Sequence, residues 1–512
     1  MYSPGSKNPA TLADLAPVAP HSATEVAAIV QRARAAQVAW SNVPQGEKER
    51  RLLSLGRRIL ERRAELSELL WQETGRSPLE SFMSDLSLAL GYAQRAIKVS
   101  RAALAPERVP LPKLEFPGKK ATTYAVPRGV VGIIAPWNYP IGNFQKSLYP
   151  ALLSGNAVIM KPSEHTPRSG AWLAALAAEC VGSDVVTVVQ GDGRVGATLV
   201  ECVDAVIFTG SVSSGRKVAA AAAARFIPAS LELGGKDAAI VLEDADLDRS
   251  ALGIAQWAFH NAGQNCAAIE RVYVVESVAD GFVTRLGRVA SKLRVACGPG
   301  DADSDLGPLQ NPAQLDIVEK HVASALAAGA RLVAGGARVG PGLGYAPTVL
   351  DHCDDTMQVV RDETFGPVVA VIRVKNVEEA IARANASPYG LNGSVWTRDL
   401  ARGEALCRRL SVGVGYVNNH AIGGTMPEVP WTGPGETGSG VAQSRHAYAT
   451  LTRRQTVLVD SNKGPDPFWM PFDRSLRPFA DALASMQLGS LSSALKLLGL
   501  IKTRVTHIRS AL

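Results

Sequence analysis

Cysteine is scarce in this chain, which holds six among 512 residues, and no two are close enough to form a Cys-x-x-Cys pair. Sparse, separated cysteines favour a reducing compartment and argue against a disulfide framework or a zinc site. No run of 18 apolar residues is present, and the first ten residues lack the apolar core of a secretory signal. The sequence therefore predicts a cytoplasmic protein without a membrane-spanning helix or a metal.

A large charge surplus is also missing. Lysine and arginine number 54 against 47 acidic residues, a net charge of +7, which is too small to indicate nucleic-acid binding. The surplus is uneven, because residues 463–512 hold seven basic and three acidic residues. Hydrophobic residues make up 46% of the chain and charged residues 20%, a balance that excludes wholesale disorder.

Short apolar runs alternate with helix-like stretches from residue 130 onward. Buried runs separated by ten or more residues are typical of βαβ units and a parallel sheet. Residues 24–100 have helical spacing, and further strands are predicted at 120–126 and 453–459. The pattern predicts an α/β fold with two successive α/β blocks. The runs predicted as their strands are 130–134, 157–160, 185–189, 205–208, 238–242, 272–275, 368–372 and 414–417.

Two glycine-rich turns compete as phosphate-binding sites. Residues 191–196 read Gly-x-Gly-x-x-Gly, and residues 210–215 begin with Gly210 and Ser211 before a helix-like stretch. Each would place backbone N–H groups at a helix N-terminus, which favours a phosphate. Spacing alone leaves both open, and either could be a tight turn that needs glycine.

Cys266 has a different setting from the other cysteines, because small and amide residues surround it between a helix-like stretch and a strand. That setting suits an accessible thiol nucleophile, although a buried structural cysteine is the alternative. Glu232 lies between two leucines before a Gly-Gly turn, which favours a carboxylate with a raised pKa. A strand-end glutamate on the surface is the alternative there.

Over residues 10–460 the chain resembles the NAD(P)-dependent aldehyde dehydrogenase superfamily. Five blocks match in the family's order and spacing: 135–140 (Ala-Pro-Trp-Asn-Tyr-Pro), 155–164 (Gly-Asn-Ala-Val-Ile-Met-Lys-Pro-Ser-Glu), 208–211 (Phe-Thr-Gly-Ser), 231–236 (Leu-Glu-Leu-Gly-Gly-Lys) with 263–266 (Gly-Gln-Asn-Cys), and 363–367 (Glu-Thr-Phe-Gly-Pro). The resemblance implies a Rossmann-like NAD-binding domain (1–107 and 128–235), an α/β catalytic domain (236–434), and a small oligomerisation element (108–127 and 435–462). Residues 463–512 form a basic tail beyond the family body.

The resemblance also implies roles for single residues. Cys266 matches the family's nucleophile, Glu232 its general base and Asn138 the side chain of its oxyanion hole. The positions that match cofactor-binding residues are Trp137, Lys161, Glu164, Gly210, Ser211, Glu363 and Phe365. The turn at Gly210 thus becomes the pyrophosphate site, and residues 191–196 become a structural turn.

The reaction implied is oxidation of an aldehyde to the acid through a thiohemiacetal and a thioester on Cys266. Glu232 favours hydrolysis over transfer to coenzyme A. NAD is the expected cofactor, because Glu164 would repel the 2′-phosphate of NADP, the alternative. The expected partners are a small aldehyde and further copies of the chain, as a homodimer or homotetramer, with no nucleic acid.

The substrate is less well defined by the sequence. Tyr139 and Trp431 are predicted to face the substrate tunnel, which favours an apolar or aromatic aldehyde. Relatives that act on succinic semialdehyde carry two arginines where this chain has Lys146 and His260. Lys146 could still hold a carboxylate, or it could be an ordinary solvated lysine.

The tail reads as a basic amphipathic helix. Leucines and other apolar residues recur at helical spacing, with lysine and arginine among them. The residues predicted to share one face are Leu488, Leu491, Leu495, Leu498, Val505, Ile508 and Leu512. The first expectation is that this face docks on protein. The second is peripheral membrane contact through residues 486–512, in an enzyme for long-chain aldehydes.

Overall fold

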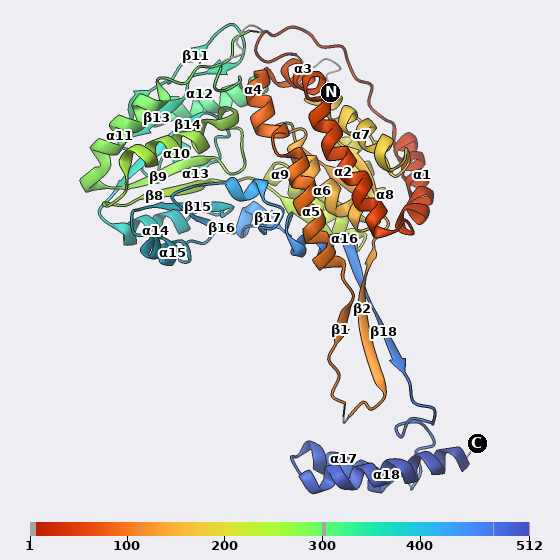
Figure 1. Ribbon diagram of the computed structural model, residues 1–512. Helices are drawn as coiled ribbons and strands as arrows, with labels where there is room; N and C mark the ends of the chain where they lie inside the picture. Colours follow the sequence, from red (N-terminus) through yellow and green to blue (C-terminus); the bar gives the residue numbers. More distant parts are fainter. Residues whose placement is uncertain (1–6, 114, 299–303, 475, 511–512) are drawn as a thin grey trace. The chain divides into compact units, whose positions relative to one another are not determined.

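The computed structural model describes residues 7–113, 115–298, 304–474 and 476–510 (Figure 1). The chain forms two compact units. The large unit contains residues 1–104 and 126–453, and the small unit contains residues 105–125 and 454–512.

A six-stranded sheet forms one half of the large unit, in the order β17-β7-β6-β3-β4-β5. Every strand in it is parallel except β17. The strands are β3 (Val130–Ile134), β4 (Ala157–Lys161), β5 (Val186–Val188), β6 (Ala205–Thr209), β7 (Ala229–Glu232) and β17 (Gly438–Ser439).

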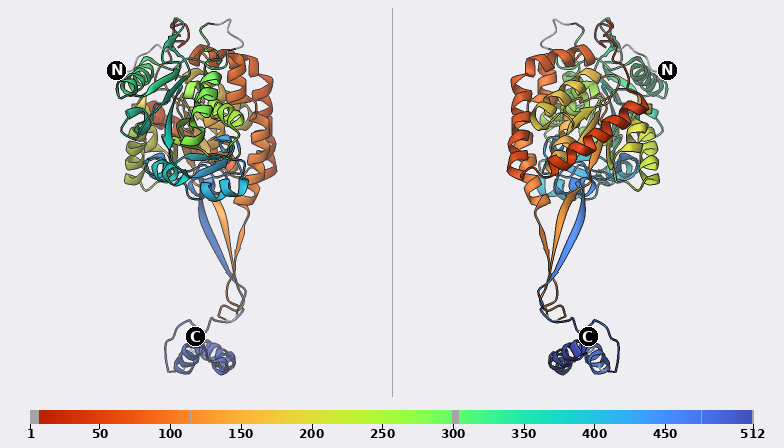
Figure 2. Two further views of the ribbon diagram at one scale, coloured as in Figure 1. Left: turned by 90° about the vertical axis from the view of Figure 1, so that its left-hand side faces the viewer. Right: turned by 90° about the vertical axis from the view of Figure 1, so that its right-hand side faces the viewer.

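Both faces of this sheet are buried under helices, as Figure 2 also shows. Side chains alternate along β3, so Val130 and Ile134 pack on one face and Val131 and Ile133 on the other. The first face is covered by α1 (Ala23–Ser41), α8 (Gly193–Cys202) and α9 (Val212–Ala224). The second is covered by α2 (Gln45–Glu61), α3 (Arg63–Thr74), α5 (Ala89–Leu104), α6 (Gly142–Leu153) and α7 (Pro167–Val181).

A seven-stranded sheet forms the other half, in the order β10-β13-β14-β9-β8-β15-β16, with β10 antiparallel to its neighbour. Its strands are β8 (Asp237–Val241), β9 (Ile269–Val275), β10 (Arg331–Ala334), β13 (Thr348–Asp351), β14 (Val368–Val374), β15 (Asn392–Trp396) and β16 (Val414–Val417). Its helices are α10 (Leu247–Phe259), α11 (Glu276–Ala290), α12 (Pro312–Ala327), α14 (Val377–Asn385) and α15 (Leu400–Cys407). The predicted fold class, two α/β blocks around parallel sheets, is confirmed.

The small unit contains the sheet β1-β2-β18 and a helical hairpin. The strands are β1 (Glu107–Val109), β2 (Lys119–Pro127) and β18 (Thr452–Asp460), so both predicted flanking strands are confirmed. The hairpin consists of α17 (Leu476–Gln487) and α18 (Leu491–Ser510). Along β18, every residue after Thr452 is exposed.

The predicted apolar face of the tail is wrong in part. Ile508 is buried, whereas Leu491 and Leu495 on the other side of α18 are exposed. Spacing alone assigned these residues to one face, but Leu497 and Ile508 lie together on the packed side. Leu512 lies outside the described residues. No described helix is long and apolar enough to cross a bilayer.

Candidate active site

Many of the predicted catalytic and cofactor-binding residues lie along one edge of the six-stranded sheet. Because β3, β4, β6 and β7 are parallel, their carboxyl ends lie at the same edge, where open α/β sheets bind ligands. The residues that end or follow these strands are Trp137, Asn138, Lys161, Gly210, Ser211 and Glu232.

The loop that leads to Cys266 has an unusual backbone. Asn261 and Ala262 have φ angles of 56° and 54°, and Gly263 has 69°. This left-handed region costs free energy for residues with a Cβ. A Cβ on Gly263 would lie 2.0 Å from the Gly366 carbonyl oxygen, so the position requires glycine.

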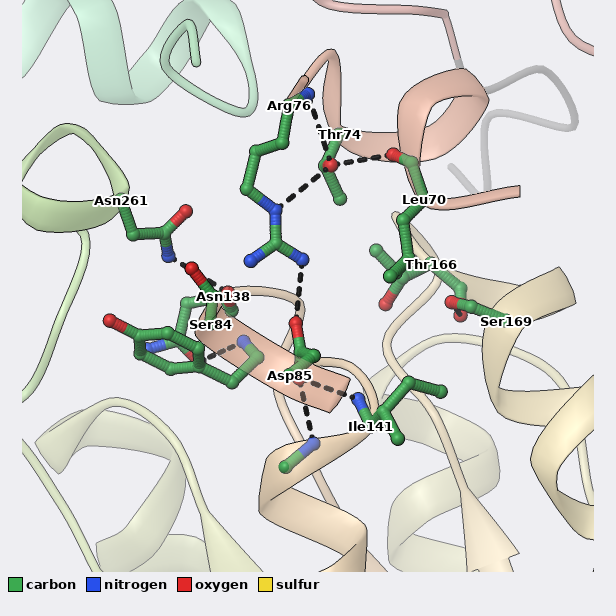
Figure 3. Close-up of polar contacts among 12 residues, drawn as sticks. Leu70, Thr74, Arg76, Ser84, Asp85, Asn138, Ile141, Thr166, Ser169 and Asn261 are labelled. Atoms are coloured by element: carbon green, nitrogen blue, oxygen red, sulfur yellow. Dashed lines mark hydrogen bonds and ion pairs between the residues drawn. The ribbon is translucent and has the colours of Figure 1, made fainter. Parts of the chain in front are cut away.

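Side-chain amides hold this strained loop in place. Asn261 Nδ2 donates to the backbone oxygens of Asn138 at 2.8 Å and Gln264 at 3.1 Å. Gln264 Nε2 donates to the Asn261 and Pro308 oxygens, and its Oε1 accepts from the Gln310 N–H at 2.8 Å. Figure 3 shows Asn261 beside Asn138. The loop before Cys266 is thereby fixed to the loop after β3.

Cys266 is half-buried, whereas both of its neighbours in the chain are buried. Burial raises the pKa of the Cys266 thiol to about 12, and the Lys146 ammonium acts in the opposite direction. The resting thiol is therefore protonated at neutral pH. Among the described residues, none accepts a hydrogen bond from the Cys266 backbone N–H, so this donor is available to a ligand.

The Asn138 side chain is buried, and two hydrogen bonds to its side-chain oxygen hold it in place. Its Oδ1 accepts from Asn143 Nδ2 at 3.0 Å and from the Tyr139 N–H at 3.1 Å. Its Nδ2 donates to the Gln264 oxygen at 3.1 Å, which directs the amide toward the Cys266 loop. The amide and the Cys266 N–H make a donor pair suited to an oxyanion.

Glu232 is buried at the end of β7, paired with Thr209 of β6 and Gly438 of β17. Burial raises the pKa of Glu232 to about 7, and Lys146 acts against that increase. Its Oε1 has no hydrogen-bond partner among the described residues. A carboxylate with a pKa near neutrality and an unsatisfied oxygen suits a general base.

A buried ion pair that no sequence motif indicated supports the same site. Arg76 Nη2 contacts Asp85 Oδ2 at 2.8 Å (Figure 3). Asp85 Oδ1 accepts from the N–H groups of Ile141 at 3.2 Å and Gly142 at 2.7 Å. The pair thus fixes the start of α6, directly after the loop of Asn138. Its members are too far from the motifs in sequence to be found by spacing.

Tyr139, a predicted substrate residue, pairs with His260, which stands where relatives that act on succinic semialdehyde carry an arginine. The Tyr139 hydroxyl is hydrogen-bonded to His260 Nδ1 at 3.0 Å, and the two rings stack. His260 Nε2 is hydrogen-bonded to Ser84 Oγ at 3.1 Å. Burial, with a contribution from Arg76, lowers the pKa of His260 to about 4. His260 therefore supplies no positive charge at neutral pH.

Lys146 and Trp431 form the other predicted substrate group. Lys146 Nζ lies 5.1 Å from the centroid of the Trp431 ring, a cation–π contact. Its charge lowers the pKa of both Glu232 and Cys266, so the ammonium lies near the reacting groups. No described residue forms an ion pair or hydrogen bond with it. Trp431 is buried, and its indole Nε1 has no partner among those residues.

The predicted cofactor residues supply the chemistry that a dinucleotide needs. Ser211 caps α9 by accepting from the Ser214 N–H, so the helix N-terminus there favours a phosphate. Lys161 is buried at the end of β4, where desolvation lowers its pKa, and Glu164 beside it is exposed. An ammonium, a carboxylate and a helix N-terminus fit ribose hydroxyls and a pyrophosphate. By contrast, Asp192 caps α8 within the turn at residues 191–196.

Glu363 and Phe365 are positioned by a buried network that the sequence reasoning missed. Glu270 accepts from the backbone N–H groups of Thr364 at 2.8 Å and Phe365 at 2.9 Å, and Lys236 Nζ is paired with Glu270. Burial raises the pKa of Glu363 to about 8, with Glu270 adding to the effect. Lys236 directly precedes β8, and Glu270 lies in β9. The two residues are 34 positions apart in the chain, so only folding brings them together.

An edge contact joins the two aromatic residues predicted near the cofactor. The ring centroids of Trp137 and Phe365 lie 5.6 Å apart, and the two ring planes are nearly perpendicular. Gly235 donates its N–H to Glu363 Oε1 at 2.9 Å, and a Cβ there would lie 2.1 Å from the Cys266 oxygen. This close approach of backbones joins the cofactor residues to the nucleophile loop.

The profile of the aldehyde dehydrogenase family matches residues 5–457. A relative from Mycolicibacterium smegmatis, with the provisional name succinate-semialdehyde dehydrogenase [NADP(+)], is 38% identical over 456 residues, which cover 87% of this chain and 86% of the relative. The 4,4'-diapolycopene aldehyde oxidase of a Methylomonas species is 35% identical, with 87% and 83% covered.

Solved structures agree with this match. An aldehyde dehydrogenase from Mycobacterium tuberculosis, complexed with NAD+, is 32% identical and superposes with a TM-score of 0.84, covering 90% of this chain and 95% of that one. Lactaldehyde dehydrogenase from Escherichia coli is also 32% identical, with a TM-score of 0.81 and coverage of 89% and 95%. The chain belongs to the aldehyde dehydrogenase family. It is an oxidoreductase that acts on aldehyde groups and uses NAD(P).

Proposed function

We propose that this enzyme releases a free carboxylic acid, with Cys266 as nucleophile, Glu232 as general base and Asn138 as oxyanion donor. The observation that carries the proposal is Glu232, a buried carboxylate with one unpartnered oxygen and a pKa near 7. Its charge raises the pKa of Cys266, which indicates that the two groups lie close together. The family match supports the same assignment.

The first step is attack of Cys266 Sγ on the aldehyde carbon. The thiol proton passes to solvent, with Lys146 favouring the thiolate. The S–C bond then forms while the carbonyl electrons move onto oxygen. Asn138 Nδ2 and the Cys266 N–H then stabilise that oxyanion. The bound nicotinamide cofactor supplies the chemistry of hydride acceptance, which leaves a thioester on Cys266.

The second step is hydrolysis of the thioester. Glu232 takes a proton from water, the water oxygen bonds to the acyl carbon, and the C–S bond breaks to release the acid. A buried base with a pKa of about 7 is half-ionised at neutral pH, which suits this role. The test is product formation without coenzyme A across a panel of aldehydes; a strict requirement for coenzyme A would overturn the hydrolytic assignment.

NAD is proposed as the preferred cofactor. Glu164 is exposed beside the buried Lys161, where a carboxylate favours a ribose hydroxyl over a 2′-phosphate. The Mycolicibacterium relative is named for NADP(+), so the two cofactors should be compared directly. A lower KM for NADP than for NAD would contradict this preference.

A carboxylate-bearing aldehyde is the second candidate substrate, beside an apolar or aromatic one. Lys146 supports it, because its ammonium lies near the reacting groups with no anionic partner among the described residues. The name of the Mycolicibacterium relative points the same way. Changing Lys146 to methionine should raise KM for succinic semialdehyde more than KM for hexanal, and an equal change in both would exclude a carboxylate contact.

We also propose a homodimer or homotetramer that uses β18. This strand lies at the end of the order β1-β2-β18, and its exposed residues include Val457, Leu458 and Val459. Such an edge is a ready site for pairing with another chain. Sedimentation velocity should show a monomer when Leu458 is replaced by aspartate.

A second proposed partner is a membrane surface, reached through residues 486–512 in a cytoplasmic enzyme.

A further inference from the structure

Four leucines of the helical hairpin are exposed although they are large and apolar. The exposed fraction is 90% for Leu488, 86% for Leu491, 75% for Leu495 and 55% for Leu498. Single exposed leucines are common on protein surfaces, but four within eleven residues are not. We call Leu488, Leu491, Leu495 and Leu498 the leucine stripe.

Two basic residues follow the leucines on the same face of α18. Positions 491, 495, 498, 502 and 509 recur three, four or seven residues apart, so they share one helix face. The last two are Lys502 and Arg509, and both are exposed. One face of α18 therefore passes from apolar to basic side chains.

The opposite face already provides the core of the hairpin. Leu497 and Ile508 are buried, and Leu497 belongs to a cluster with Phe479 and Ala482 of α17. The buried Arg504 donates to backbone oxygens of the segment before α17, including that of Trp469 at 2.7 Å. The hairpin is thus packed without the leucine stripe, which remains free for a partner.

The charge pattern favours a lipid surface over a second copy of the hairpin. Asp481 is the only acidic residue among the described residues from 476 to 510, and it lies on α17. Two stripes packed together would bring the basic residues of both copies near one another without compensation. An anionic bilayer instead offers acyl chains to the leucines and phosphates to Lys502 and Arg509.

We propose that the leucine stripe, with Lys502 and Arg509, docks α18 flat on an anionic bilayer. The leucines enter the boundary between headgroups and acyl chains, and the two basic residues remain at the phosphates. This assigns a face to the peripheral contact. It does not depend on the chemistry at Cys266, because binding and turnover are measured separately.

The test is sedimentation of the full-length enzyme with phosphatidylcholine vesicles, prepared with and without phosphatidylserine. We expect binding to the anionic vesicles and little binding to the neutral ones. Replacing Leu491, Leu495 and Leu498 together by glutamine should lower partitioning on the order of 100-fold. Recovery of the wild-type enzyme in the supernatant, or equal binding of the triple variant, would overturn the proposal.

A matched pair of charge variants tests the direction of docking. Lys502→Glu and Lys496→Glu change the net charge equally, but Lys496 lies off the stripe. We expect Lys502→Glu to weaken binding several-fold more than Lys496→Glu; an equal loss would show nonspecific charge attraction and contradict the stripe. All variants should oxidise propanal at the wild-type rate, and a lipid-free change of oligomeric state in the triple variant would identify a protein interface instead.

Discussion

The Cys266 centre and the leucine stripe depart from the usual separation of apolar interior and polar surface in opposite directions. Around Cys266, Glu232 is buried and Glu363 is half-buried, and burial raises the pKa of each. On α18, leucines are exposed instead. Both arrangements cost free energy in the isolated chain, so each indicates a bound partner. The first fits a small reactive molecule, and the second fits an extended surface.

The two regions also differ in how they are fixed. The Cys266 loop keeps left-handed residues only because Asn261 and Gln264 hold it with several hydrogen bonds. The hairpin relies on a small apolar cluster and on the buried Arg504. Replacing the Cys266 or Glu232 side chain should change chemistry with little loss of folding, whereas replacing Asn261 or Gly263 should disturb the loop itself. Substitutions in the hairpin should change folding or docking without altering chemistry.

Removing the nucleophile should have the largest effect. Cys266→Ala should lower NADH formation by about 10,000-fold or more, because no other group forms the thioester. Cys202→Ala, a matched change at another half-buried cysteine, should leave the rate near that of the wild type. Near-normal turnover of the Cys266 variant in a spectrophotometric assay would contradict its role.

Loss of the oxyanion donor should rank second. Asn138→Ala should lower kcat by about 100- to 1,000-fold, the usual effect of removing one such donor. Asn143→Ala removes only the amide that orients Asn138, so we expect a smaller loss in the same assay. An equal loss in the two variants would indicate a structural role for both.

Removing the positive charge beside Glu232 should have a smaller, pH-dependent effect. Glu232 acts as a base when ionised, so hydrolysis should increase as pH rises through about 7 and level off above it. Lys146→Met removes a charge that lowers the pKa of Glu232, and this increase should therefore move to higher pH. Lys146→Arg should restore the wild-type profile of kcat against pH. An unchanged profile in the methionine variant would separate Lys146 from the base.

Two neighbouring leucines should have the smallest effect on turnover, because their substitution acts on the hairpin alone. Leu497→Ala should lower the free energy of unfolding of the hairpin by about 2–4 kcal/mol, because Leu497 is buried. Leu498→Ala should change it by less than about 0.5 kcal/mol, because Leu498 is exposed. Hydrogen exchange of the α17 and α18 amides measures both. Equal destabilisation would mean that the stripe is part of the core.

The sequence predicted the strands of the sheets where apolar runs are continuous. The run at residues 130–134 coincides with β3, and that at 414–417 with β16. It missed β15, Asn392–Trp396, because asparagine, glycine and serine interrupt the apolar pattern although the strand is buried. The sequence also could not predict which face of α18 is exposed, because packing against α17 decides which apolar side chains are covered.

The residues of the candidate site were predictable where they belong to short sequence motifs. Cys266, Glu232 and Asn138 were found from short blocks, and the structure brings their loops together. Arg76 with Asp85, and Lys236 with Glu270, were not found, because each pair is assembled from separated segments with no local pattern. The roles assigned to all these residues remain predictions.

The most direct test of the central claim is a single turnover of the Glu232→Gln variant. If Cys266 forms the thioester and Glu232 acts only in its hydrolysis, NADH should appear as a burst of about one equivalent per subunit, followed by slow turnover. Mass spectrometry should then locate the acyl group on Cys266. Absence of the burst, or an acyl group on another residue, would contradict the account.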